Sequence, residues 1–428
     1  NISESALTLL WSTIVSIFTL GGLLGVSIGG TLSVKLGRKG TLLTNNFFSL
    51  TAALLMGLSS SVGLFELLII GRFLIGINAG IGLCVEPMFL GEISPTAFRG
   101  ALGSGTSIFL TVGILSGQVM GLDEVLGQEE FWPYLLSTTC IPAILQLLIL
   151  PWFPESPRYL FIDKGDEEGC KKALRQLHGL ADCDSSLEDI QKEKSNLAGF
   201  RAKKPWELFT DRSVRWQLLT IIVINMAQQL NGVNAMYFYA DYVFLQSGIP
   251  IEKTPYATVG TGACECFTAL TCGLLIECLG RKVLITGGYI LMSICCILKL
   301  EAFSSFILWS YFNKSLCWVF FCEGGVTNIL NNELFTQNAR PAAFMIAGTV
   351  NWLSFFLVGL FFPFIVIGLQ HYCFLVFFVV CSSVAVYILL VVPETKNKTF
   401  VEIQNEFKSS RNSSTSDGSG TTLLSTCL

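Results

Sequence analysis

The feature that most constrains this chain is a series of apolar runs, each about 20 residues long, that recurs along almost its whole length. A helix of that length crosses the hydrocarbon core of a bilayer. Of the 428 residues only 14% are charged, too few to cover a soluble domain of this size. The candidate spans are 7–29, 42–63, 67–90, 102–122, 133–153, 216–244, 256–278, 284–302, 306–322, 341–365 and 371–392. These spans predict an all-α polytopic membrane protein.

The chain also repeats itself. Three short motifs occur twice in the same order, at offsets of 243, 241 and 239 residues. They are Gly37-Arg38-Lys39 with Gly280-Arg281-Lys282, Glu92 and Arg99 with Glu333 and Arg340, and Pro154-Glu155-Ser156 with Pro393-Glu394-Thr395. Parallel repeats of this length are typical of the major facilitator fold, in which two six-helix bundles surround a central site.

The repeat predicts the domain boundaries. We expect a first bundle at 1–153, a linker with short helices at 154–215, a second bundle at 216–400 and a Ser/Gly-rich, largely disordered tail at 401–428. The second copy opens with span 216–244, whose counterpart would precede residue 1. The first bundle is therefore expected to lack its first helix, with twelve spans in the intact protein.

Basic loops predict the orientation. Lys and Arg cluster after the first, third, fifth and seventh of these spans, whereas the loop 123–130 is acidic. By the positive-inside rule the basic loops, the linker and the C-terminus are cytoplasmic. Asn1 would then be an extracellular glycosylation acceptor. We expect a multi-pass plasma-membrane protein.

These motifs resemble the facilitative glucose transporters, the sugar-porter branch of the major facilitator superfamily. The resemblance spans roughly residues 7–408 and includes 71–76 (GRFLIG), 91–100 (GEISPTAFRG), 154–160 (PESPRYL), 228–241 (QQLNGVNAMYFYAD) and 333–343 (ELFTQNARPAA). The YAD ending and 324–330 (GGVTNIL) are similar to the fructose-handling branch. The resemblance implies a passive uniporter that moves glucose or fructose by alternating access.

A hexose presents hydroxyls, so its site needs uncharged donors and acceptors, and side-chain amides supply both. The run 228–234 holds four amides, and residues three apart share a helix face. The resemblance implies that the sugar contacts lie there and in other spans. The expected substrate-binding residues are Gln118, Gln228, Gln229, Asn234, Glu265, Asn328 and Trp352.

Three departures from the family pattern leave the substrate open. Asn328 replaces a tryptophan, while Glu265 and Phe355 replace asparagines. An acidic residue inside a span is costly and usually functional. Glu265 therefore keeps open a proton-coupled sugar transporter or a urate carrier, and a non-transporting membrane receptor or scaffold is the alternative from another class.

A carrier must be bistable, and charged residues at the cytoplasmic helix ends provide a switch. We expect ion pairs within each half to hold the cytoplasmic ends together until the carrier opens inward. The expected pairs involve Arg38, Glu92, Arg99 and Glu155 in the first half, and Arg281, Glu333, Arg340 and Glu394 in the second.

Other functional classes find little support. The sequence has no P-loop and no catalytic triad, which argues against an ATP-driven pump or an enzyme. Most of the 15 cysteines lie in apolar runs, and with two histidines and no CxxC pair we expect neither a metal nor a cofactor. The expected partners are a small-molecule sugar and the lipid bilayer, with no nucleic acid.

Overall fold

A computed structural model describes residues 4–95, 99–178, 183–196, 203–231, 250–302, 326–369 and 373–396, together with 398, 402, 403 and 406. The first half contains α1 (Glu4–Lys35), α2 (Arg38–Val62), α3 (Phe65–Ile93), α4 (Arg99–Gly103), α5 (Gly105–Met120), α6 (Trp132–Ser137) and α7 (Cys140–Ile149). The linker contains a π-helical turn (Tyr159–Lys164), α8 (Glu167–His178), α9 (Cys183–Asn196) and α10 (Pro205–Thr210). The second half contains α11 (Arg215–Leu230), α14 (Thr254–Leu279), α15 (Arg281–Ala302), a helix at 326–333, α17 (Arg340–Leu369) and α18 (Cys373–Val391).

The helices match the apolar runs. Among the described residues, seven helical stretches are long and apolar enough to cross a membrane, and the shorter 375–391 is also apolar. The polytopic helical fold is thus confirmed. The predicted span 306–322 and the second half of 216–244 lie outside the described residues.

One predicted span is built differently. The run 133–153 forms two helices, α6 and α7, that meet at Thr138 and Thr139. Pro142 has no N–H to donate to the carbonyl oxygen of Thr138, four residues earlier. The helix therefore breaks there, and Pro142 lies in the first turn of α7, where a missing N–H costs little.

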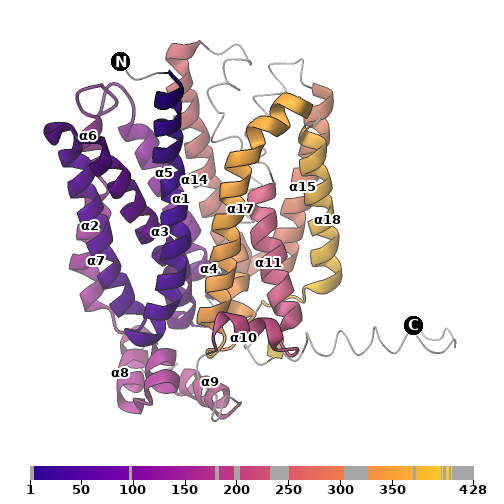
Figure 1. The fold of residues 1–428 in the computed structure, drawn as a ribbon. Helices are drawn as coiled ribbons and strands as arrows, with labels where there is room; N and C mark the ends of the chain where they lie inside the picture. Colours follow the sequence, from indigo (N-terminus) through magenta and orange to yellow (C-terminus); the bar gives the residue numbers. More distant parts are fainter. Residues whose placement is uncertain are drawn as a thin grey trace.

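The two halves stand side by side and meet along two seams (Figure 1). One seam packs α1 against α17, and the other packs α5 against α14. Small residues bring the helices close at the first seam, because a Cβ on Gly22 would overlap the ring of Trp352 and one on Gly30 would overlap Met345. The seams place spans from both repeats around the centre of the molecule.

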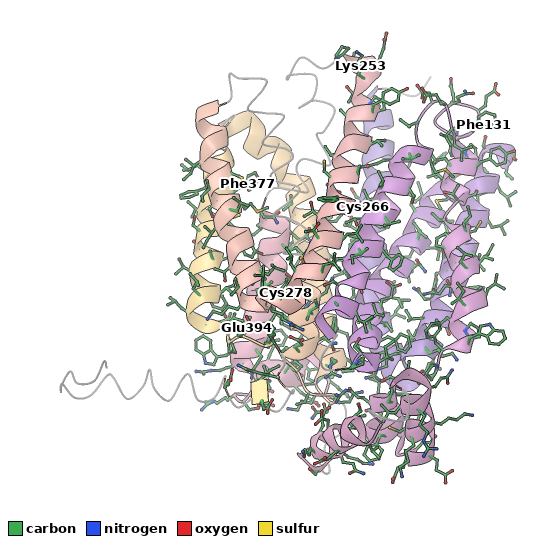
Figure 2. All side chains as sticks on the ribbon, turned by 180° about the vertical axis from the view of Figure 1, so that it is seen from behind. Phe131, Lys253, Cys266, Cys278, Phe377 and Glu394 are labelled. Atoms are coloured by element: carbon green, nitrogen blue, oxygen red, sulfur yellow. The ribbon has the colours of Figure 1, made fainter. Side chains whose placement is uncertain are left out.

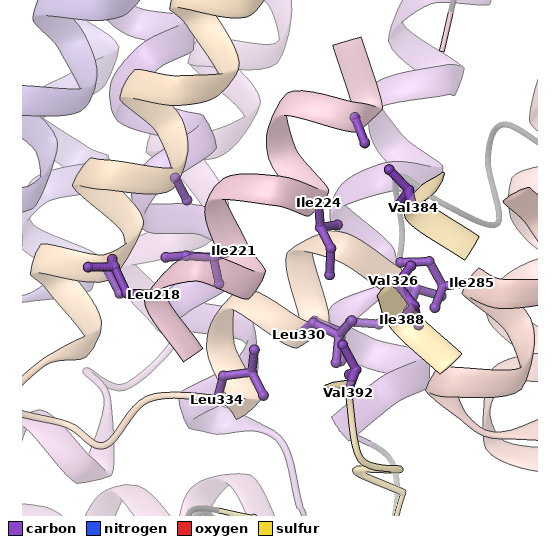
Figure 3. Packing of buried hydrophobic residues seen from close by; sticks show 14 of the residues in the cluster. Leu218, Ile221, Ile224, Ile285, Val326, Leu330, Leu334, Val384, Ile388 and Val392 are labelled. Atoms are coloured by element: carbon purple, nitrogen blue, oxygen red, sulfur yellow. The ribbon is translucent and has the colours of Figure 1, made fainter. Parts of the chain in front are cut away.

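Each half has its own apolar core. The larger core lies in the second half, where α11, α14, α15, the helix 326–333, α17 and α18 contribute buried side chains (Figure 3). A smaller core in the first half gathers residues of α2 and α3, including Leu42, Ile77 and Met88. Most buried apolar contacts thus lie within one half, and Phe344 of α17 reaches across to join the first-half core.

The linker helices α8, α9 and α10 lie together at one end of the bundle, called here the linker end (Figure 1). Phe131 and Lys253 lie at the opposite end, and Glu394 lies toward the linker end (Figure 2). All three repeated motifs come to the linker end, where helices of both halves begin or finish.

Candidate functional site

The first copy of the repeat builds a capped helix start. Gly37 has a φ of 84°, which favours glycine, and α2 begins at the next residue. The backbone N–H groups of Arg38 and Lys39 both donate to the carboxylate of Glu155 at 3.1 Å. This carboxylate therefore satisfies N–H groups that a helix start leaves without a partner. Its negative charge also interacts favourably with the positive end of the helix dipole.

The second copy repeats this geometry. Gly280 has a φ of 89°, and α15 begins at Arg281. The N–H groups of Arg281 and Lys282 donate to the Glu394 carboxylate at 2.9 and 3.0 Å. Glu155 and Glu394 were expected in ion pairs, but the hydrogen bonds described here make them caps of α2 and α15.

Glu92 is the centre of the charged cluster at the linker end. Its carboxylate lies 2.8 Å from Arg38 Nε and accepts a hydrogen bond from Arg38 Nη2 at 2.9 Å. The Ser156 hydroxyl donates to the same carboxylate. Arg340 Nη1 donates to it as well, at 3.2 Å. The Glu92, Arg38 and Arg340 side chains are fully buried, so two cations share one carboxylate away from solvent.

The Arg340 contact differs from the expectation of ion pairs within each half. Arg340 begins α17 in the second half, whereas Glu92 belongs to α3 in the first, so this pair joins the halves. Within the second half, Arg281 Nη2 lies 3.4 Å from Glu333, longer than the 2.8 Å of its first-half counterpart. The structure describes only the backbone of Arg99, at the start of α4.

The linker supplies two acidic residues that sequence reasoning missed. Asp163 Oδ2 lies 3.4 Å from Arg38 Nη1 and accepts a hydrogen bond from Gln337 Nε2 at 3.1 Å. Burial raises the pKa of Asp163, and the opposing effects of Arg38 and the Gln337 hydrogen bond are smaller. Glu193 pairs with Arg158 and accepts the backbone N–H of Gln337 at 2.9 Å. Both carboxylates bridge the first half or linker to the segment just before Arg340.

Close packing accompanies these ion pairs. A Cβ on Gly91, one residue before Glu92, would overlap the side-chain amide of Asn332 in the second half. One on Gly103 would lie 2.8 Å from Ile329 Cγ1. The halves are thus in direct contact at the linker end, which is closed in this structure.

The predicted sugar amides on α11 are partly paired. Gln229 is buried, and its Nε2 donates to Asn351 Oδ1 on α17. Gln228, its neighbour, is half-buried. Asn234 lies outside the described residues. Asn351 is a further amide that sequence reasoning did not select, although it stands next to Trp352 in an apolar span.

Gln118 and Glu265 lie at the α5–α14 seam. The Gln118 Oε1 atom adjoins Gly262 of α14 and, among the described residues, has no hydrogen-bond partner. Glu265 lies three residues after Gly262 and is 4% exposed. Cys266 Sγ, on the same stretch, lies 3.6 Å from Thr111 Oγ1 of α5. A polar strip thus runs along a seam between the halves.

Trp352 lies at the other seam. Its ring meets Phe18 of α1 edge-to-face, with centroids 5.5 Å apart, and lies over Gly22. Its Nε1 is buried and has no protein acceptor within the described part of the chain. Asn328 is half-buried in the helix 326–333. The structure thus distributes those predicted sugar residues that it describes over both seams and the second half.

Comparison with known proteins agrees with this architecture. Residues 1–407 match the family model described as "Sugar (and other) transporter". The chain is 47% identical to facilitated glucose transporter member 5 of Ovis aries over 415 residues, which covers 95% of this chain and 82% of the relative. It is 45% identical to member 11 of Homo sapiens, covering 93% and 82%, and 46% identical to member 9 of Mus musculus, covering 95% and 77%.

Solved structures of the E. coli transporter XylE share the fold. A double-tryptophan mutant superposes with a TM-score of 0.84 at 23% identity, covering 95% of this chain and 91% of the other. The proton:xylose symporter XylE bound to 6-bromo-6-deoxy-D-glucose gives 0.83 with the same coverage. The relatives are transporters rather than enzymes. With its repeated linker-end motifs, its two helical halves and these matches, the chain belongs to the sugar transporter family, among the facilitated glucose transporters of solute carrier family 2.

Proposed function

We propose that this protein is a facilitative uniporter that moves hexoses, glucose or fructose, across the membrane by alternating access. The observation that carries the proposal is the buried Glu92–Arg340 pair. This pair joins the two halves at the linker end. Its two groups belong to different halves, so they separate when the halves rock apart. An ion pair between the two halves can break and form again, and a carrier requires such a reversible closure.

Uncharged polar groups support a sugar as the substrate. Gln118 Oε1 and Trp352 Nε1 are buried atoms without partners among the described residues, and each matches a sugar hydroxyl in hydrogen-bonding capacity. Gln228, Gln229, Asn234, Glu265 and Asn328 complete the proposed set. The relatives are named facilitated glucose transporters, which supports the same substrate class.

We place the linker end and the C-terminus in the cytoplasm of a plasma-membrane protein. Lys35 ends α1, Lys39 lies in the first turn of α2, Lys164 ends the π-helical turn and Lys204 directly precedes α10. These helix ends lie at the linker end, whereas Asp123 and Glu124 follow α5 in the loop at the opposite end. Positive charge near the spans marks the cytoplasmic side. The linker-end pairs are then the cytoplasmic closure.

Uptake into liposomes tests the proposal. We expect saturable uptake of labelled glucose or fructose by the full-length protein, inhibited by excess unlabelled sugar and insensitive to an imposed pH gradient. Accumulation above equilibrium driven by that gradient would refute uniport. Absence of hexose flux would refute the substrate class and favour a receptor or scaffold.

Glu265 favours a second candidate, a proton-coupled sugar transporter or a carrier of an anion such as urate. Glu265 is 4% exposed within α14, a position where a carrier of neutral sugars has no evident need for an acidic group. If protons are coupled through it, Glu265→Gln will abolish gradient-driven accumulation while sugar exchange continues. Competition between labelled hexose and urate separates the two substrates.

A further inference from the structure

Two asparagines bond to each other inside the buried core of the second half. Asn225 on α11 and Asn331 in the helix 326–333 are 4% and 3% exposed. Asn225 Nδ2 donates to Asn331 Oδ1 at 3.1 Å and to the backbone oxygen of Ile221 at 2.7 Å. A buried amide is costly unless it is paired, so this bond favours one relative position of the two helices.

The apolar contacts around the pair do not by themselves specify that position. Ile221, Ile224, Val326 and Leu330 belong to the same buried cluster (Figure 3). Apolar side chains of similar size can repack after a small shift with little loss. The 3.1 Å hydrogen bond between the two amides cannot survive such a shift, because moving one helix by one residue would separate them.

On one side, the bond reaches the proposed sugar site. Asn225 lies four residues before Gln229, and residues four apart lie on the same face of a helix. Gln229 donates a hydrogen bond to Asn351 of α17, and Gln228 directly precedes Gln229 in the chain. The positions of the α11 amides therefore depend on where Asn225 is held.

On the other side, the bond reaches the closure at the linker end. Asn331 is followed directly by Asn332, whose amide packs against Gly91 of the first half. The backbone oxygen of Asn332 accepts a hydrogen bond from Arg340 Nε at 3.3 Å. A displacement of the helix 326–333 therefore displaces a contact between the halves and a partner of the residue that pairs with Glu92.

We propose that the Asn225–Asn331 bond couples the α11 amides to closure of the linker end. Both residues are positioning residues for the transport cycle, and the inference rests on the proposed hexose transport. The bond stabilises the state in which the linker end is closed. Its loss lowers the population of that state, and the apparent affinity for sugar arriving from the opposite end falls with the population.

The test is a double-mutant cycle on the full-length protein in cells, with glucose as the probe. KM is measured for uptake and, from preloaded cells, for efflux. We expect Asn225→Ala and Asn331→Ala each to raise the uptake KM about two- to tenfold, with the efflux KM unchanged or lower. The double variant should resemble the single variants, since all three remove the same bond.

A matched control separates this role from simple stability. Asn45 is 4% exposed and exchanges amide-to-backbone hydrogen bonds with Asn78 between α2 and α3, at 3.0 and 3.1 Å. Asn45→Ala should lower thermal stability without changing the ratio of uptake KM to efflux KM. The paired replacement Asn225→Leu with Asn331→Leu leaves no unpaired amide and guards against misfolding. It should show the same altered ratio as the alanine variants.

Equal changes in both KM values, additive effects in the double variant, or the same altered ratio in Asn45→Ala would overturn the coupling while hexose transport itself stands. No hexose transport by the unmodified protein would instead refute the proposed function, and this inference with it.

Discussion

Glu92 is the residue on which the closure depends, because one buried carboxylate serves a cation from each half. Arg38 and Arg340 both contact it, and all three side chains are fully buried. A buried charge is tolerated only when paired, so both arginines depend on Glu92, although Arg38 also contacts Asp163. The hydroxyl of Ser156, the third residue of the linker, donates a further hydrogen bond to the carboxylate.

We therefore predict that Glu92→Gln opens the linker end. Removing one member of a buried pair costs about 3–5 kcal/mol. The cost falls mainly on the closed state, because the pair between the halves is formed only there. A difference of about 3 kcal/mol corresponds to roughly a hundredfold change in population. The apparent affinity for sugar offered from the opposite end should fall accordingly, measured as the KM of uptake.

Glu66→Gln is the control for that prediction. Glu66 lies in the first turn of the same helix, α3, and is exposed at the other end. It loses the same charge without touching the cluster and should leave uptake unchanged. If Glu92→Gln transports like the unmodified protein, the inter-half pair does not contribute to closure.

At the scale of elements, the repeated motifs define how two helices begin. In each copy a glycine with positive φ turns the chain, and a carboxylate just after the last span of the same half accepts the first N–H groups of the helix. Position 280 requires glycine for two reasons. Its φ is positive, and a Cβ there would lie 2.6 Å from Glu394 Oε2. The motif is thus one structural unit made from two distant segments.

We predict that Gly280→Ala destabilises the second half by about 1–3 kcal/mol, through left-handed backbone strain and displacement of Glu394. Gly287→Ala is the matched control in the same helix, since a Cβ there meets nothing within 4 Å. It should be neutral or stabilise the protein by up to about 1 kcal/mol. Thermal unfolding in detergent compares the two, and equal melting temperatures would contradict the cap.

At the scale of the whole molecule, the halves meet through glycines as well as through charges. Gly22 and Gly30 bring α1 against α17, and Gly91 and Gly103 bring the first half against the helix 326–333. Gly91 directly precedes Glu92, so its contact with Asn332 lies beside the charged cluster at the linker end. A side chain at Gly91 would therefore act as a wedge between the halves.

We predict that Gly91→Ala holds the linker end open and reduces transport at least tenfold, because its Cβ would overlap the Asn332 amide. The distance between labels at positions 36 and 279 reports the opening. Leu36 and Leu279 are 49% and 48% exposed and precede the two repeated glycines, one in each half. Labels with chemistry orthogonal to thiols avoid the 15 native cysteines.

The matched control is Gly113→Ala on α5, where a Cβ meets nothing within 4 Å. Its label distance and transport should equal those of the unmodified protein. An unchanged distance in Gly91→Ala would show that the linker end accommodates the extra methyl group without opening.

The sequence by itself was sufficient for what depends on local pattern. Apolar runs predict helices wherever the bilayer is the solvent, because the backbone must satisfy its hydrogen bonds within the span. The repeat predicted two similar halves, and the motifs identified the sugar transporter family. The amide-in-apolar-span criterion that selected Gln118 would also have selected Asn225 and Asn351, but only their packing shows which partners they meet.

The tertiary structure alone decided how the repeated charges are shared. The duplicated motifs supply four arginines and four glutamates, two of each in every copy. The sequence contains no distances by which to choose among their possible pairings. Packing of the halves brings Arg340 to Glu92 across the interface and leaves Glu155 and Glu394 at the starts of α2 and α15. Ion pairing and capping act over a few ångströms, whereas the groups concerned lie more than a hundred residues apart along the chain, so only the folded arrangement selects one pairing.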